Sequence, residues 1–160
     1  GWIGVNTHLA NRVAAEGIAS DVVVELAGST SMRREVRYGE GSRIDLLLDG
    51  PRGRCYVEVK NVTMLDARGR YAFPDAVTAR GRKHLGELAS MVEQGHRAVM
   101  FFLIQRSDGD GFAPAADVDP GYADALHRAV DRGVEALAYR ADVTPQAITV
   151  TEKVEVELGA

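Results

Sequence analysis

The stretch SRIDLLLDGPRGRCYVEVKN, residues 42–61, contains two expected strands and the turn that joins them. Apolar residues dominate 44–48, and polar and apolar residues alternate over 56–60, as in strands with a covered face. The run at 50–53 forms turns readily, because Pro51 presets one turn dihedral and the flanking glycines tolerate positive φ. The stretch therefore predicts a β-hairpin with strands at 42–49 and 54–61.

The segments around this hairpin predict further helices and strands. Residues 98–104 are apolar without interruption, which is typical of a central strand covered on both faces. The strand–helix–strand connections imply parallel pairing with right-handed crossovers. The chain is therefore expected to be one domain over residues 1–160, an α/β fold whose mixed β-sheet is flanked by helices. The remaining expected elements are a helix capped by Asn6 or Thr7 and ended by Gly17, a helix at 78–94, a helix between Asp119 and Gly133, strands at 34–38, 97–105, 134–139 and 149–156, and a loop at 66–74.

The composition matches an ordinary globular protein and excludes several other classes. Of 160 residues, 46% are apolar and 26% charged, which argues against a disordered, collagen-like or coiled-coil chain. The longest apolar stretch, 98–104, is about a third of what a bilayer span needs. The start has no charged-then-apolar signal segment, and the single cysteine, Cys55, has no partner for an internal disulfide. These features predict a cytoplasmic protein outside the membrane.

Charge is unevenly distributed along the chain. The net charge is −4, but residues 33–84 carry 12 basic and 7 acidic side chains, a balance of +5, which leaves −9 elsewhere. Such asymmetry favours either one face for a polyanion or a solvated arginine-rich surface.

Two carboxylates and a lysine are expected to meet on the hairpin. If Asp49 faces Arg54, the same register places Asp45 opposite Glu58, with Cβ atoms about 4.5–5.5 Å apart. Lys60 shares the face of Glu58, because side chains alternate across a strand. Two such carboxylates repel each other, and a divalent cation such as Mg²⁺ or Mn²⁺ would remove the conflict. The alternative is a structural ion pair in which Lys60 neutralises the acids.

Several motifs together resemble the sugar fermentation stimulation protein A (SfsA) family within the PD-(D/E)XK nuclease superfamily. The resemblance runs in consistent order from Trp2 to about Val154. Its motifs are Trp2-Ile3-Gly4-Val5-Asn6-Thr7, Ser42-Arg43-Ile44-Asp45, Glu58-Val59-Lys60-Asn61-Val62-Thr63, Phe73-Pro74-Asp75-Ala76-Val77-Thr78, Arg80 with Lys83-His84-Leu85, and Gly95-His96-Arg97-Ala98-Val99.

The resemblance implies a restriction-endonuclease-like core associated with DNA binding and with regulation of sugar-utilisation genes. It implies that Asp45 and Glu58 are metal ligands and that Lys60 is the catalytic lysine. Superfamily members often add an acid from the first helix, for which Glu16 is the candidate. The OB-like barrel that usually begins the family is expected to be absent from this chain.

Basic residues outside this trio are candidates for contact with nucleic acid. Cations at the start of the 78–94 helix oppose its dipole, so phosphate contact and a solvated turn are both open explanations. Asp75, just before that helix, is expected to cap it, and a role near the metal is the alternative. The candidate nucleic-acid contacts are Arg43, Arg68, Arg70, Arg80, Lys83 and His84.

Three functions are compatible with these patterns. The first is metal-dependent phosphodiester hydrolysis of nucleic acid, with DNA preferred to RNA as the partner. The second is a non-catalytic DNA-binding transcriptional regulator with a vestigial metal site, and the third is a protein-interaction domain.

Overall fold

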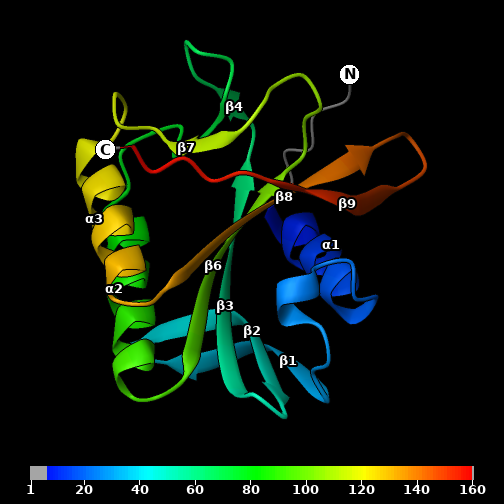
Figure 1. Ribbon diagram of the computed structural model, residues 1–160, viewed down its shortest axis with the longest axis vertical. Coiled ribbons are helices and arrows are strands. Elements are labelled where there is room, and N and C mark those ends of the chain that lie inside the picture. Colours follow the sequence, from blue (N-terminus) through cyan, green and yellow to red (C-terminus); the bar gives the residue numbers. More distant parts are fainter. Residues whose placement is uncertain (1–6, 160) are drawn as a thin grey trace.

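A six-stranded mixed β-sheet forms the centre of the fold (Figure 1). The computed structural model describes residues 7–159, so most of the Trp2 motif and the expected Asn6 cap lie outside the described residues. The expected fold class, a mixed sheet flanked by helices, is confirmed. In sheet order, the strands are β1 (Ser31–Tyr38), β2 (Ser42–Gly50), β3 (Gly53–Val62), β6 (Arg97–Ile104), β8 (Glu135–Val143) and β9 (Ile148–Val154).

The expected hairpin is formed by β2 and β3. The two strands pair antiparallel, with Asp49 opposite Arg54 and Leu46 opposite Val57, which is the register of a turn at 50–53. Gly53 has a φ of 91°, a conformation that residues with a Cβ rarely adopt. On the other side of β2, β1 pairs antiparallel and begins at Ser31, earlier than expected.

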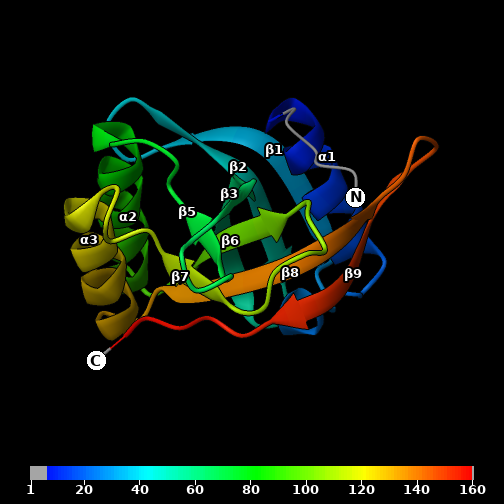
Figure 2. The same cartoon turned by 90° about the horizontal axis from the view of Figure 1, so that it is seen from above.

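Helices cover both faces of this sheet, as the two views show (Figures 1 and 2). The face under α2 (Ala79–Glu93) and α3 (Pro120–Asp131) buries Phe102, whereas the face under α1 (Thr7–Ala19) buries Phe101. β3, β6 and β8 run parallel, as the crossovers require. Both phenylalanines are 0% exposed, which confirms the two-sided burial expected of this strand. None of the described helices is long and apolar enough to span a bilayer.

A small second sheet lies beside the main one and was not expected. It is formed by β4 (Met64–Leu65), β5 (Tyr71–Phe73) and β7 (Phe112–Pro114). The expected loop at 66–74 therefore contains a strand, which is too short to show periodicity in the sequence. The turn before β5 is held by Asp66 Oδ1, which accepts hydrogen bonds from the backbone N–H groups of Arg68 and Arg70.

Two helix boundaries differ from expectation. Gly17 does not end α1, which continues to Ala19; instead, a Cβ on Gly17 would lie 2.7 Å from Val150 Cγ2, so glycine permits close approach to β9. Asp75 does not cap α2, because Thr78 does so by accepting a hydrogen bond from Gly81 N at 2.9 Å. The expected cap of α3 is confirmed: Asp119 accepts from Tyr122 N at 2.9 Å.

Candidate active site

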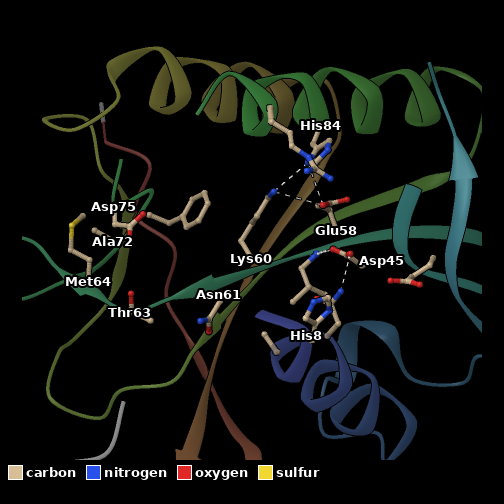
Figure 3. Close-up of a pocket in the computed structure, with 16 residues that line it drawn as sticks. His8, Asp45, Glu58, Lys60, Asn61, Thr63, Met64, Ala72, Asp75 and His84 are labelled. Carbon is tan, nitrogen blue, oxygen red and sulfur yellow. Dashed lines mark hydrogen bonds and ion pairs between the residues drawn. The ribbon is translucent and has the colours of Figure 1, made fainter. Parts of the chain in front are cut away.

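A cavity of about 690 Å³ opens where β2 and β3 meet the first turns of α1 and α2 (Figure 3). The crossover from β3 to β6 leaves the carboxyl end of β3 beside α2, so polar side chains near the end of that strand face the cavity. Asp45, Glu58 and Lys60 all line it, although the β2–β3 ladder ends at Leu46 and Val57, so Asp45 is not paired opposite Glu58 as expected.

Asp45 is fixed by two hydrogen bonds at the point where the β2–β3 ladder ends. Its Oδ2 accepts from Val59 N at 2.7 Å, so the side chain replaces a backbone partner of β3. Its Oδ1 accepts from Asn11 Nδ2 of α1 at 2.9 Å. Asp45 is therefore held from both the sheet and the helix that covers it.

Glu58 is buried at 4% exposure, and one of its oxygens has no partner. Burial and, to a smaller extent, the charge of Asp45 together raise the pKa of Glu58 to about 8. The other oxygen, Oε1, lies 3.7 Å from Lys60 Nζ. Because Oε2 remains unsatisfied, the lysine does not neutralise this carboxyl group completely.

Lys60 and His84 form the opposite wall of this cluster (Figure 3). Lys60 Nζ lies 3.2 Å from His84 Nδ1, and His84 Nδ1 lies 3.3 Å from Glu58 Oε1. Burial and, to a smaller extent, the charge of Lys60 together lower the pKa of His84 to about 4, so its ring is neutral at neutral pH. The ammonium then donates to Nδ1, which leaves the ring proton on Nε2.

The structure brings some of the remaining predicted residues to the cavity and leaves others outside it. Arg80 and His84 line the cavity, although His84 is buried in contact with Glu58 rather than exposed to solvent. Lys83 donates instead to Glu40 O at 2.9 Å. Arg43 lies beside the 39–41 turn that joins β1 and β2, while Arg68 and Arg70 lie in the turn before β5.

The expectation that Glu16 joins the carboxylates is corrected by its position on α1. Glu16 is exposed and lines a separate hollow beside the 144–149 turn. Asn11 is the α1 residue that contacts Asp45. Five residues separate Asn11 and Glu16, which corresponds to about 140° around a helix with 3.6 residues per turn, so both cannot face the same site.

Sequence reasoning missed several residues of the cavity, among them His8, Asn11 and Glu35. Nothing in the sequence singles out Asn11 as a site residue, because asparagine is common on the solvent-exposed face of a helix. Glu35 lines the cavity from β1 and has a φ of 56°, a left-handed conformation that non-glycine residues rarely adopt. It lies between the paired residues Arg34 and Val36, so the β1–β2 ladder is interrupted opposite Asp45.

These features define a class of protein: a restriction-endonuclease-like α/β domain whose β2–β3 hairpin presents Asp45, Glu58 and Lys60 to a polar cavity that Glu35 and Asp75 also line. Asp45 and Glu58 are the neighbouring carboxylates that could hold a cation. The chain belongs to the sugar fermentation stimulation protein family, because the family model described as "Sugar fermentation stimulation protein RE domain" matches residues 8–147.

Individual relatives agree with this assignment. A sugar fermentation stimulation protein homolog of Geobacter sulfurreducens is 56% identical over 158 residues, which are 99% of this chain and 67% of that protein. The homolog of Brucella anthropi is 53% identical over 156 residues, 97% of this chain and 67% of its own length. The solved structure of Pyrococcus furiosus SfsA in complex with Ca²⁺ has a TM-score of 0.87 at 29% identity, covering 96% of this chain and 66% of that one. The chain thus spans about two-thirds of the relatives it matches.

Proposed function

We propose that this domain hydrolyses phosphodiester bonds of nucleic acid, DNA in preference to RNA, with a divalent cation held by Asp45 and Glu58. The observation that carries the proposal is the buried, unpartnered Oε2 of Glu58 beside a second carboxylate. An anion in that position is unfavourable unless a cation joins it. The proposal places the protein with its substrate in the cytoplasm.

The donor set fits Mg²⁺ or Mn²⁺. Mg²⁺ is commonly held by one or two carboxylates, with water and phosphate oxygens completing the octahedron. Among residues 7–159, no three His, Cys, Asp or Glu side chains form a metal-ligand cluster. The cation would therefore depend on two carboxylates and on substrate, and the Ca²⁺ complex of the Pyrococcus furiosus relative supports divalent-cation binding within the family.

Each side chain has a separate task in this proposal. The bound cation would supply Lewis-acid activation of a phosphoryl oxygen and of water. Lys60 donates to His84 and forms an ion pair with Glu58, and its remaining N–H groups serve the attacking water or a phosphate oxygen. Neutral His84 holds the ammonium in position, and Arg80 at the cavity wall contacts a phosphate.

The test is cleavage of single- and double-stranded oligonucleotides in Mg²⁺ or Mn²⁺. We expect Asp45→Asn and Lys60→Ala each to lower the rate by about 10²–10³. Asp49→Asn is the matched control, because Asp49 lies on the same strand but pairs with Arg33 and Arg54 away from the cavity. Undiminished cleavage by Asp45→Asn or Lys60→Ala would refute the assignment.

The second candidate is a non-catalytic DNA-binding regulator with a vestigial site. The absence of a third acidic or histidine ligand among the described residues favours it. It predicts binding whose log affinity falls by roughly 0.9 per neutralised phosphate on a log-salt axis, with no metal-dependent cleavage. The two candidates therefore differ in the cleavage assay alone.

A further inference from the structure

Two arginines oppose each other directly on the β1–β2 hairpin. Arg37 of β1 and Arg43 of β2 are paired residues of this antiparallel ladder. Like charges in opposed positions repel each other and destabilise a strand pair. The pair therefore needs an explanation other than stability.

Neither arginine is neutralised within the protein. Both side chains are exposed, and neither forms a hydrogen bond or an ion pair with any residue the structure describes. Arg33, on the same strand, behaves differently, because its Nη2 lies 3.4 Å from Asp49 Oδ2. Arg34, in the middle of β1, is likewise exposed without an ion pair to a described residue, so Arg37 and Arg43 are the two such arginines of the hairpin that lie beside its turn.

The pair lies close in sequence to the candidate active site, although neither arginine lines the cavity itself. Arg43 and Asp45 are separated by one residue of β2, so their side chains share a face about 7 Å apart along the strand. Arg37 and Arg43 line a hollow of about 680 Å³ beside the turn, together with Tyr38 and Ser42. Gly39 and Gly41 keep the turn small, with φ of 58° and 74°.

We infer that Arg37 and Arg43 form a two-arginine phosphate clamp that holds the nucleic-acid backbone leaving the active site. This inference rests on the proposed function and names the path of the substrate strand. A phosphate between two opposed guanidinium groups converts their repulsion into two charge-assisted contacts. The clamp binds backbone and is indifferent to base sequence.

The test measures binding of short fluorescein-labelled single-stranded and duplex DNA by fluorescence anisotropy, with EDTA present so that no hydrolysis occurs. Arg37→Gln and Arg43→Gln are compared with Arg33→Gln, which removes the same charge from a partnered position. We expect each clamp variant to raise Kd about tenfold at low salt and to reduce the log–log salt slope by about 1. Arg33→Gln should bind as wild type does. Without DNA, Arg43→Gln should also raise Tm, because it removes the repulsion.

The outcomes separate this inference from the proposed function. If both clamp variants bind as wild type does, or if Arg33→Gln loses as much affinity as they do, the clamp is refuted. Absence of wild-type binding at low salt refutes it as well. In each case cleavage with Mn²⁺, measured separately on wild type and Asp45→Asn, decides the proposed hydrolysis on its own.

Discussion

The carboxyl group of Glu58 is buried beside Asp45, and burial raises its pKa to about 8 from the 4.5 of an unperturbed glutamate. The folded chain therefore holds a proton that the unfolded chain has released between about pH 4.5 and pH 8. Glu58 consequently lowers the stability of the metal-free protein as pH rises through that window, and the loss is complete above it.

The first prediction follows from this loss of stability with rising pH. In the absence of metal, Glu58→Gln should raise the free energy of unfolding by about 1–3 kcal/mol near pH 9, because the amide removes a buried anion. The gain should largely disappear near pH 5, where wild-type Glu58 is protonated. Urea unfolding of both proteins at the two pH values checks this, and an equal difference at both would contradict it.

The backbone of Glu35 supplies the second prediction. Glu35 has a φ of 56°, a backbone conformation that a β-branched residue such as valine adopts only with strain. Glu35→Val should therefore lower the free energy of unfolding by about 1–2 kcal/mol, although the side chain is exposed. Arg34→Val, at the adjacent exposed position without positive φ, is the control and should change stability little. Similar losses in both variants would show that the conformation of Glu35 is not responsible.

Strand alternation predicted correctly that Glu58 and Lys60 share a face, whereas Asp45 reaches the same cavity beyond the end of the β2–β3 ladder, without the expected pairing opposite Glu58. The hairpin register follows from a short turn, and the turn residues are unambiguous. The contact between Asn11 and Asp45 could not be predicted from the strand pattern, because it depends on how α1 is rotated about its axis against the sheet. The same rotation places Glu16 in a different hollow.

Among the elements, α1 packs close to β9 because Gly17 has no side chain at the point of contact. Gly17→Ala should lower the free energy of unfolding by about 1–2 kcal/mol, because the new Cβ would meet Val150 Cγ2 at 2.7 Å. Gly86→Ala on α2 is the matched control, since nothing lies within 4 Å of its Cβ position. There, alanine should stabilise by about 0.5–1 kcal/mol through helix propensity. Thermal unfolding of the two variants tests this, and a stabilising Gly17→Ala would contradict the close approach.

The elements with a strong pattern were predictable, and the short ones were not. The uninterrupted apolar run at 98–104 indicates a central strand, and its residues are apolar because both faces of β6 are covered. β4, β5 and β7 contain two or three residues each, and their pairing is decided by tertiary position. Gly17 resembles a helix stop in sequence, whereas only the neighbouring strand reveals its packing role.

Over the whole molecule, the positive balance of residues 33–84 does not form one uniform patch. Asp49 pairs with Arg33 and Arg54, and Arg70 pairs with Asp66. Arg80, beside the cavity, is among the arginines that form no ion pair with a described residue. The position of each arginine is therefore more informative than the net charge of residues 33–84.

A fourth prediction compares two positions in this segment. Arg80→Gln should weaken DNA binding severalfold, because Arg80 lines the cavity that would hold phosphate. Arg70→Gln, which removes the same charge from a residue paired with Asp66, should weaken binding less. Anisotropy titrations at one low salt concentration measure both, and an equal loss would show that binding follows total charge alone.

Titration with Mn²⁺ tests the cation claim most directly, because binding requires Glu58 to release its proton. Calorimetry in buffers of different ionisation enthalpy should show wild type binding one Mn²⁺ with release of nearly one proton near pH 7, and little release near pH 9. Glu58→Gln and Asp45→Asn should each bind at least about tenfold more weakly. Equal affinity in wild type and both variants, or binding without proton release near pH 7, would contradict the account.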